Sequence, residues 1–203
     1  MGRYGSMIRL ATADDATQIA EIYRPAVETN ATSFEATAPD STEMARRIVT
    51  TIQRFPWLVA DEAGFVRSYA YASAHRDRTA YQWSVEVSAY VRSGAQRQGT
   101  ARALYTSLFA ILALQGFRNA YAGITLPNHA SVGFHMAMGF TRVGVFKGIG
   151  YKHGAWHDVA WFERALRAHD IEPDCPQPLA EISATSEFAA AVRAGDGRQA
   201  TES

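Results

Sequence analysis

The chain is poor in cysteine and has no surplus of charge of either sign. Its one cysteine, Cys175, excludes a disulfide within the chain and a cysteine metal cluster. Basic and acidic residues balance to a formal net charge of +0, and the absence of a basic block argues against a nucleic-acid-binding protein. No apolar run approaches the length of a membrane span, and the N-terminus lacks the apolar core of a signal peptide. We therefore expect a cytoplasmic protein that binds neither nucleic acid nor membrane.

The composition is that of an ordinary globular protein. Of the 203 residues, 47% are hydrophobic and 20% are charged, which is enough to bury a full core. Apolar periodicity covers most of the chain, and prolines become frequent toward its C-terminal end. We predict a leader at 1–6, one folded domain at 7–166 and a partly flexible extension at 167–203 with one short helix near 186–194.

Hydrophobic periodicity predicts an alternation of strands and helices. The first helix starts near Asp14, and Pro25 is expected to end or kink it because proline lacks a backbone N–H. Gly116 is expected to end the third helix. The order of elements predicts an α/β fold, with a mixed sheet covered by helices on both faces. The predicted strands are 7–12, 56–60, 65–73, 85–91, 120–124, 141–151 and 156–162, and the later helices are 41–55, 99–115 and 129–138.

The most informative segment runs from the strand at 85–91 through a polar turn into the helix that begins near Gly99. Such a loop leaves backbone N–H groups unpaired at the helix N-terminus, where the helix dipole also favours an anion. Gly99 and Ala101 are small enough to let phosphates approach the backbone, and Arg97 and Arg102 can add positive charge. The segment therefore predicts a pyrophosphate cradle, although a solvated turn before a basic helix would have a similar sequence.

Two sequence blocks resemble a known superfamily. Gln96-x-x-Gly99-x-Ala101 is similar to the acyl-CoA signature Arg/Gln-x-x-Gly-x-Gly/Ala of the GNAT N-acetyltransferases. The block from Asn128 to Phe140 resembles their motif Asn-x-x-Ser/Ala-x-x-x-Tyr/His-x-x-x-Gly-Phe, at the expected distance from the first block. Together the two blocks make the solvated turn a poor alternative.

Three further stretches narrow the resemblance to the phosphinothricin and methionine sulfoximine acetyltransferases. Those stretches are 54–60, 80–86 and 151–159. The resemblance runs through 8–166 and implies the GNAT fold with a mostly antiparallel mixed sheet, acetyl-CoA as co-substrate and a homodimer. The chain departs from the subfamily pattern at Ser68, where glycine is usual, and at Ser93, where proline is usual. We expect 167–203 to have no counterpart in the subfamily.

The resemblance also assigns acetyl-CoA to three segments. Backbone amides from Arg97 to Arg102 would anchor the pyrophosphate, and a bulged strand at 87–91 would present backbone groups to the pantetheine and the thioester oxygen. Asn128 would hydrogen-bond the pantetheine or the acetyl group, or cap its own helix. The predicted coenzyme-binding residues are Val87, Ala89, Val91, Gln96, Arg97, Gln98, Gly99, Thr100, Ala101, Arg102, Asn128 and Ser131.

Two residues are candidates for proton transfer. Glu86 occupies the subfamily position of the catalytic base, on the strand beside the cradle, and could face the acetyl group directly or through a water. The alternative is a solvated carboxylate that pairs with an arginine. His135 lies where many superfamily members carry a tyrosine acid, so it could protonate the thiolate or assist amine deprotonation. It could equally be a core side chain with satisfied hydrogen bonds.

The expected acceptor is a small amino acid analogue, whose carboxylate suits a bidentate arginine. Arg76 and Arg78 are the best cationic candidates, unless they pair with Asp77. The aromatic residues that could wall the pocket, or belong to the core instead, are Phe34, Tyr81 and Trp83.

The sequence predicts an enzyme without a metal site. His153 and His157 are spaced as on a metal-binding helix, but a strand would hold them about 13 Å apart. We predict an N-acetyltransferase that moves acetyl from acetyl-CoA to the α-amino group of a phosphinothricin-like or methionine sulfoximine-like amino acid, by direct attack in a ternary complex. The alternatives are the same chemistry on a polyamine, aminoglycoside or peptide N-terminus, and a non-catalytic acyl-CoA-binding module.

Overall fold

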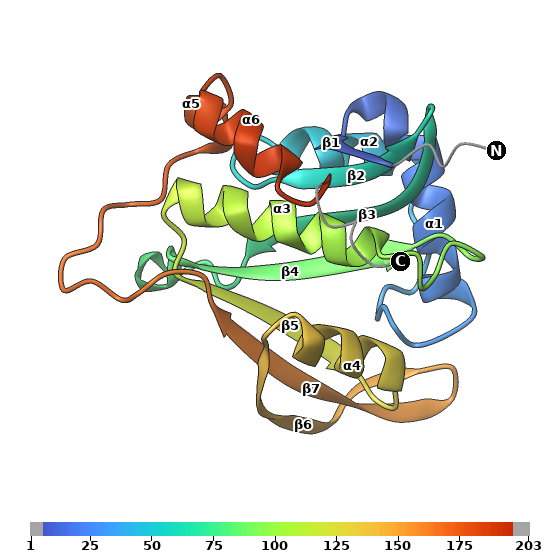
Figure 1. Cartoon of the computed structure of the whole chain (residues 1–203). Coiled ribbons are helices and arrows are strands. Elements are labelled where there is room, and N and C mark those ends of the chain that lie inside the picture. The colour runs from blue at the N-terminus through green and yellow to red at the C-terminus, as the bar shows by residue number, and fades with distance from the viewer. Residues whose placement is uncertain (1–5, 197–203) are drawn as a thin grey trace.

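The computed structural model describes residues 6–196, so the predicted leader at 1–6 lies outside the described residues except for Ser6. Seven strands form one sheet in the order β1-β2-β3-β4-β5-β7-β6 (Figure 1). Only β4 and β5 pair in parallel, while the other neighbours are antiparallel. The predicted mixed, mostly antiparallel sheet is confirmed. The strands are β1 (Met7–Leu10), β2 (Trp57–Glu62), β3 (Phe65–Ala74), β4 (Ser84–Val91), β5 (Asn119–Thr125), β6 (Thr141–Lys152) and β7 (Ala155–Ala165).

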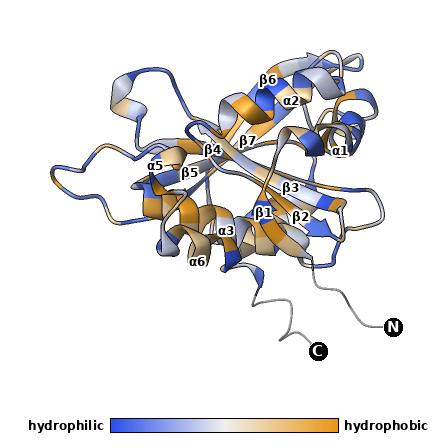
Figure 2. Cartoon of the chain, turned by 90° about the horizontal axis from the view of Figure 1, so that it is seen from above, coloured by the Kyte–Doolittle hydropathy of each residue, from blue (hydrophilic) through white to orange (hydrophobic). Residues whose placement is uncertain are grey.

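Helices cover both faces of the sheet, as Figure 2 shows from above. One face carries α1 and α2, and the other carries α3 and α6. None of the helices between residues 6 and 196 combines the length and the apolar character that crossing a membrane requires. The helices are η1 (Ala13–Asp15), α1 (Ala16–Glu28), α2 (Ser41–Thr51), η2 (Thr79–Tyr81), α3 (Thr100–Gln115), α4 (His129–Ala137), α5 (Leu179–Ile182) and α6 (Ser186–Arg193).

The interior strand β2, second in the sheet, explains why the sheet has two cores. Its residues alternate between the faces: Leu58 and Ala60 join the core beneath α3, whereas Trp57 and Val59 join the core beneath α1 and α2. All four are buried. A strand that is covered on both faces has a continuous run of apolar residues in its sequence, as residues 57–60 do.

The strands β4 and β5 separate soon after they begin. Their parallel register contains Ser84↔Asn119, Val85↔Ala120 and Glu86↔Tyr121 and ends there. Figure 1 shows the two strands diverging toward the N-terminus of α3. The edge of β4 that faces β5 is therefore free of strand pairing beyond Glu86.

The helix boundaries test the local sequence signals. Gly99 and Gly116 flank α3 in left-handed conformations, with φ of 81° and 100°, and the predicted end of this helix is confirmed. Of the two outcomes expected at Pro25, a helix end is wrong, because α1 continues to Glu28. Ala26 and Val27 are buried in the adjoining core, and this packing offsets the hydrogen bond that proline removes.

The C-terminal extension packs against α3. The helix predicted near 186–194 is confirmed as α6, whereas the four-residue α5 was missed because it is too short for a periodic signal. The hydroxyl of Ser107 on α3 donates to the carbonyl of Val192 at 2.6 Å and accepts the N–H of Gly195 at 3.0 Å. This segment therefore shares the core of the domain predicted at 7–166. Its buried apolar residues are Leu179, Ile182, Phe188 and Ala191.

Candidate active site

The loop between β4 and α3 presents a series of free backbone donors. Arg97 and Gly99 have positive φ values of 63° and 81°, and such alternation turns successive N–H groups toward one side. Within the described part of the chain, the N–H groups from Gln96 to Arg102 form no hydrogen bond. Ala95 is buried and anchors the loop. The geometry has the form of an anion-binding cradle at a helix N-terminus.

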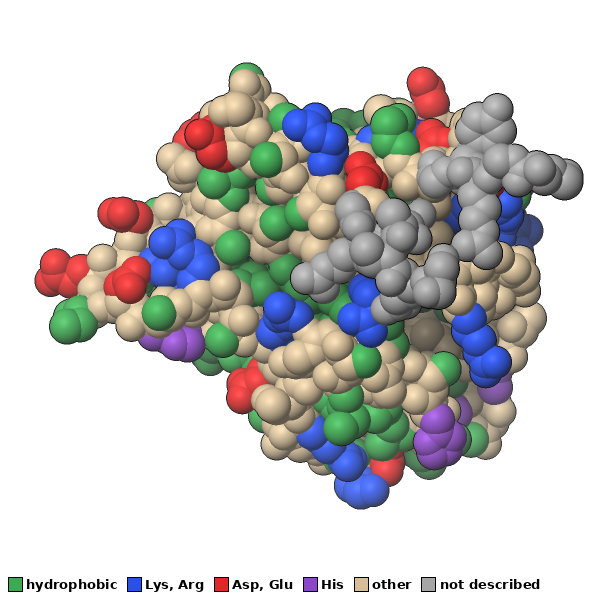
Figure 3. All heavy atoms as spheres, in the orientation of Figure 1, with side chains coloured by type: hydrophobic (Ala, Val, Ile, Leu, Met, Phe, Trp, Pro, Cys, Tyr) green, Lys and Arg blue, Asp and Glu red, His purple; other side chains and the backbone are tan. Residues whose placement is uncertain are grey.

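Basic side chains extend this cradle along the outer side of α3. A cavity of about 480 Å³ lies between α3 and the end of α4 and is lined in part by Arg102, Met138 and Arg164. Burial lowers the pKa of Arg164, whose guanidinium donates to the carbonyl of Met138. Figure 3 shows basic side chains along the hollow between α3 and α4.

The strand β4 continues from the cradle with a regular register. Its pairing with β3 runs unbroken from Ser68↔Val91 to Ala74↔Val85, so the bulge expected at 87–91 is absent. The alternation of the strand accounts for this: Val87 lies in the core beneath α3, and Tyr90 packs against the opposite core. An inserted residue would move one of these side chains to the wrong face.

Glu86 lies on β4 at the point where β5 separates from it. Its Oε1 is 3.1 Å from Nδ1 of His75 and 3.3 Å from Nη1 of Arg76. The Glu86 side chain is 32% exposed and that of His75 is 14% exposed. The structure thus brings the predicted base and one predicted substrate-binding arginine together. The pairing of Glu86 with an arginine, one of the two sequence interpretations, is present, but the carboxylate is also accessible.

Aromatic rings surround the His75 imidazole. It stacks on Tyr121 of β5, with ring centroids 4.5 Å apart and an interplanar angle of 19°. The edges of Trp161 and Tyr81 meet it at centroid distances of 6.0 Å each. Burial raises the pKa of Tyr121, and the nearby Glu163 acts in the same direction, so this phenol stays neutral. The His75 ring is therefore held by residues from three separate elements.

Sequence reasoning missed His75, Tyr121 and Trp161 as site residues. The antiparallel register Ser73↔Glu86 brings the end of β3 beside Glu86, and the parallel pair Glu86↔Tyr121 does the same for β5. The position of His75 could have been inferred from the sequence. Pairing the predicted strands 65–73 and 85–91 as antiparallel neighbours would have placed His75 near Glu86. Tyr121 and Trp161 depended on the strand order, which the sequence pattern does not contain.

A second cavity, of about 120 Å³, opens on the same face of the sheet as Glu86. Tyr71 lines it and pairs with Ser88, one alternation along β4 from Glu86. The indole N–H of Trp57 is buried without a hydrogen-bond partner among the described residues. The Arg47 guanidinium lowers the pKa of the neighbouring Glu35 despite its partial burial. Further lining residues are Tyr23, Met44, Thr51 and Tyr69.

Three of the predicted substrate-binding residues form no hydrogen bond or ion pair with Glu86 within residues 6–196. Arg78 is exposed and precedes η2, and its side chain makes no hydrogen bond or ion pair within the described residues. The indole N–H of Trp83 donates to the carbonyl of Asp174 at 2.8 Å, which directs this ring to the C-terminal extension. Phe34 packs on Gly150 of β6. Tyr81 reaches the site only through its contact with His75.

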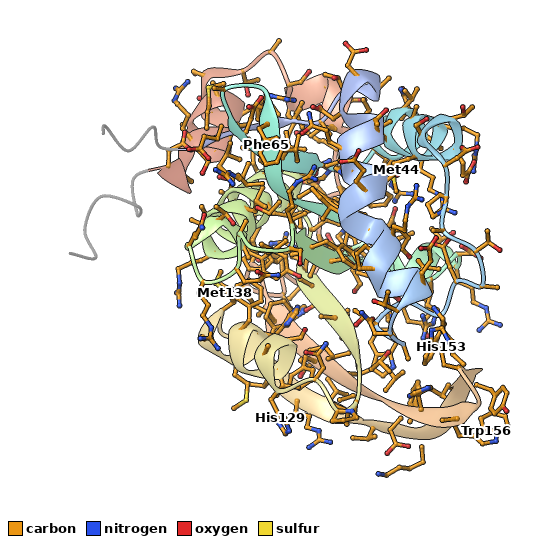
Figure 4. The ribbon with its side chains drawn as sticks, turned by 90° about the vertical axis from the view of Figure 1, so that its right-hand side faces the viewer. Met44, Phe65, His129, Met138, His153 and Trp156 are labelled. Atoms are coloured by element: carbon orange, nitrogen blue, oxygen red, sulfur yellow. The ribbon has the colours of Figure 1, made fainter. Side chains whose placement is uncertain are left out.

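The α1–α2 loop that carries Phe34 is tied to the β6–β7 hairpin. Lys152 donates to the carbonyl of Ser33 at 2.7 Å, and Nε2 of His153 lies 3.3 Å from the carbonyl of Asn30. Figure 4 shows His153 between the hairpin and the end of α1, with Trp156 at the outer end of the hairpin. These contacts close one side of the face on which Glu86 lies.

His135 and the start of α4 form a separate buried cluster. Nε2 of His135 is 3.1 Å from the Tyr105 hydroxyl, and Nδ1 is 2.8 Å from the carbonyl of Ser131. Burial lowers the pKa of His135, although the contact with Ser131 opposes this. Asn128 caps α4 by accepting the N–H of Ser131 at 3.0 Å. Both imidazole nitrogens are therefore engaged within the protein.

Comparison with protein families and curated relatives identifies related enzymes. Residues 8–161 match the family model described as acetyltransferase (GNAT) domain. The phosphinothricin N-acetyltransferase of Streptomyces viridochromogenes is 38% identical over 87% of this chain and 94% of its own length. The L-methionine sulfoximine/L-methionine sulfone acetyltransferase of Salmonella typhimurium is 31% identical over 83% of this chain and 99% of its own length.

Solved structures give the same result for the fold. A phosphinothricin acetyltransferase from Sinorhizobium meliloti, solved in complex with acetyl-CoA, superposes with a TM-score of 0.79 at 39% identity, covering 84% of this chain and 94% of its own. The match to the Streptomyces enzyme spans 87% of this chain, so it must extend past Asp170 wherever it begins. The expectation that all of 167–203 lacks a counterpart is therefore wrong for the first part of this segment.

Proposed function

Because the chain belongs to the GNAT acetyltransferase family, we propose that it transfers acetyl from acetyl-CoA to the α-amino group of a small amino acid analogue. The proposed acceptors are phosphinothricin and methionine sulfoximine or sulfone, and the amine attacks directly within a ternary complex. The observation that carries the proposal is the position of Glu86, where β4 and β5 separate, on the strand that leads into a loop of free backbone donors.

The cradle residues fit the coenzyme. Acetyl-CoA supplies the acetyl group as a thioester. The free N–H groups from Gln96 to Arg102 would hold its pyrophosphate. Apart from each glycine and its two chain neighbours, no atom of the described residues lies within 4 Å of the position of a Cβ on Gly94 or Gly99. The β4 edge at Val87, Ala89 and Val91 would bind the pantetheine and direct an N–H at the thioester oxygen. One such donor typically contributes about 3 kcal/mol in the transition state.

Glu86 is the base in this proposal. Its carboxylate takes a proton from the acceptor ammonium, which frees the nitrogen lone pair for attack. His135 has a structural role here, because both of its ring nitrogens are engaged by Tyr105 and Ser131. Its contacts hold α4 against α3, and Asn128 and Ser131 would still face the coenzyme from the start of α4.

Arg76 and the smaller cavity would bind the acceptor. The Arg76 side chain is 50% exposed, and one of its nitrogens contacts Glu86, so the remaining donors are free for the acceptor carboxylate. The cavity of about 120 Å³ is lined by Tyr71, whose partner Ser88 is the next residue after Glu86 on the same face of β4. Its volume suits a short side chain. The unpaired N–H of Trp57 would supply a donor for a sulfoximine or phosphinate oxygen.

The direct experiment measures free thiol release from acetyl-CoA with a panel of amines. The panel contains phosphinothricin, methionine sulfoximine, methionine sulfone, common amino acids, spermidine and an aminoglycoside. We expect turnover with the amino acid analogues alone. Turnover confined to the cationic amines would contradict the proposed acceptor class, and binding of acetyl-CoA without turnover on any amine would contradict the enzymatic proposal.

Variants at two arginines of the same loop locate the carboxylate clamp. Arg76→Ala is expected to raise the KM for the amino acid acceptor by roughly 10- to 100-fold, the loss of a charge-assisted pair of about 1.5–3 kcal/mol. Arg78→Ala is the matched control, because Arg78 lies two residues away and is exposed. If Arg78→Ala raises the KM more than Arg76→Ala, the clamp is misassigned.

We further propose that the protein is a cytoplasmic homodimer that pairs through the β6–β7 hairpin. Large apolar side chains are exposed there, and a second copy of the chain would cover them. Trp156 is 70% exposed at the outer end, and Trp156→Glu should shift the mass measured by light scattering from dimer to monomer. A monomeric wild-type protein would refute the proposal. The exposed apolar residues are Val143, Phe146, Ile149, Tyr151 and Trp156.

A further inference from the structure

His75 contacts the carboxylate of Glu86, and neither the sequence motifs nor the proposed mechanism gives it a role. We propose that His75 is a positioning residue, which fixes the orientation of the Glu86 carboxylate. This inference rests on the proposed function, in which Glu86 removes the proton from the acceptor ammonium. His75 directly follows Ala74, the last residue of β3, and Ala74 pairs with β4.

The contact determines which oxygen of Glu86 acts. An ionised carboxylate only accepts hydrogen bonds, so Nδ1 of His75 must carry the proton that lies between them. The Nη1 of Arg76 donates to the same oxygen, Oε1, at 3.3 Å. Since both donors lie on Oε1, Oε2 is the oxygen left to receive the proton. In that step the N–H bond of the ammonium breaks and an O–H bond forms on Oε2, while His75 keeps its own proton.

Aromatic rings from three elements hold the His75 imidazole in the orientation that contacts Glu86. Tyr121 on β5 stacks against its face, Trp161 on β7 meets it at 76°, and Tyr81 in η2 meets it at 77°. Only 14% of the His75 side chain is exposed. A base whose partner cannot rotate is kept close to one geometry, and small displacements of a reacting group are costly to the rate.

The polar surroundings of the ring leave Glu86 as the hydrogen-bond partner of Nδ1. The charged or polar groups that face the ring are Glu86 on β4, Arg76 beside it, Tyr81 in η2 and Tyr121 on β5, with Glu163 opposite Tyr121.

Two substitutions at His75 separate hydrogen bonding from packing. His75→Phe keeps an aromatic ring on Tyr121 but removes the donor to Glu86. His75→Asn loses the ring but can place an amide N–H near the position of Nδ1, and it does not titrate. Both are measured with acetyl-CoA and the best amine of the panel, for kcat and for each KM. Thermal unfolding and the Kd for acetyl-CoA report whether each variant is folded.

We expect His75→Phe to lower kcat by roughly 10- to 100-fold, with the KM for acetyl-CoA unchanged. His75→Asn should recover most of this loss. This combination is specific to positioning, because a role in packing alone would be better preserved by phenylalanine than by asparagine.

The inference is overturned if His75→Phe keeps the wild-type kcat. It is also overturned if both variants lose kcat equally, because His75 would then act through packing alone. Glu86→Gln distinguishes this failure from failure of the proposed function. If Glu86→Gln is slow and the His75 variants are unaffected, only the proposed role of His75 is contradicted. If Glu86→Gln is fully active, the assignment of Glu86 as the base is contradicted.

Discussion

The two sides of β4 are built by different means. Toward α3, the binding groups are backbone N–H groups from Gln96 to Arg102, and positive φ values at Arg97 and Gly99 give the loop its shape. Toward the face covered by α1 and α2, side chains meet around Glu86, and they come from the loop after β3 and from β4, β5 and β7. The proposed pyrophosphate cradle is therefore assembled within one stretch of chain, and the proposed acceptor side requires several strands.

This difference fits the chemistry that each side is proposed to perform. A pyrophosphate has the same charge and shape for every member of the family, and backbone donors at a helix N-terminus bind it without any particular side chain. An acceptor amine must be distinguished from other amines, which requires side chains at set positions. Substitutions that affect one side and leave the other intact measure how independent the two sides are.

Glu86→Gln should have the largest effect and should be confined to the acceptor side. The amide cannot take the proton from the ammonium, so kcat is expected to fall by roughly 10²- to 10⁴-fold near neutral pH. The Kd for acetyl-CoA, measured by calorimetry, should stay the same, because the backbone donors are untouched. Full kcat in this variant would show that the base lies elsewhere.

Gly99→Val should affect the coenzyme side. The branched side chain would obstruct the approach of the phosphates, and the loss of one hydrogen bond to a charged group, about 1.5–3 kcal/mol, corresponds to roughly 10- to 100-fold in the Kd for acetyl-CoA. Gly64→Val is the matched control, because Gly64 has φ of +85° against +81° for Gly99. Apart from the chain neighbours, no atom among residues 6–196 lies within 4 Å of either Cβ position.

The control measures the strain of valine at positive φ without a ligand nearby. Both variants should lose similar stability in thermal unfolding, and only Gly99→Val should lose affinity for acetyl-CoA. Equal affinities in the two variants would place the phosphate cradle elsewhere. A change in the acceptor KM of Gly99→Val would show that the two sides of β4 are coupled.

The contrast between local and non-local features also explains which parts of the site could be predicted from the sequence. The helix boundaries at Gly99 and Gly116, and the cradle between β4 and α3, are local features, and local residues predicted them. The acceptor side was predicted only where a motif pointed to it. His75 was passed over, and Trp83 was assigned to the pocket although it bonds to Asp174 in a segment far along the chain. Strand order and the path of the extension are non-local, and periodicity does not contain them.

Ser107→Ala should lower stability and leave both sides of β4 functional. Ser107 is fully buried, and its hydroxyl bonds both Val192 and Gly195 of the extension. Loss of the hydroxyl leaves a buried N–H and a buried carbonyl unpaired, which should cost about 1–3 kcal/mol in the free energy of unfolding. The measurement is urea unfolding together with kcat and the Kd for acetyl-CoA.

Ser183→Ala is the control for this variant, because Ser183 belongs to the same extension but is exposed. It should change the free energy of unfolding by less than about 0.5 kcal/mol. A loss of acetyl-CoA affinity in Ser107→Ala would mean that the extension helps to shape the cradle through α3. The coenzyme side would then depend on non-local contacts after all, and the contrast with the acceptor side would weaken.

The smallest predicted effect is the pH dependence that His135 adds to stability. Burial lowers its pKa below the ordinary value of 6.5, so the native state holds the imidazole neutral while the unfolded chain takes up a proton as the pH falls below 6.5. The unfolded state then binds more protons, and stability decreases toward acid pH by at most about 1.4 kcal/mol per pH unit for this group. The dependence ends once the native imidazole is itself protonated.

His135→Gln should remove this part of the pH dependence, whereas His129→Gln, at an exposed position of the same helix, should retain it. Urea unfolding at about pH 7.5 and about pH 5.5 gives the comparison. The same variant tests the division between the two sides of β4, because His135 lies in the cluster between α3 and α4. A fall in kcat of roughly 100-fold or more, with the stability profile unchanged, would make His135 a proton donor. Side-chain chemistry would then act on the coenzyme side as well, since the thiolate leaves from that side.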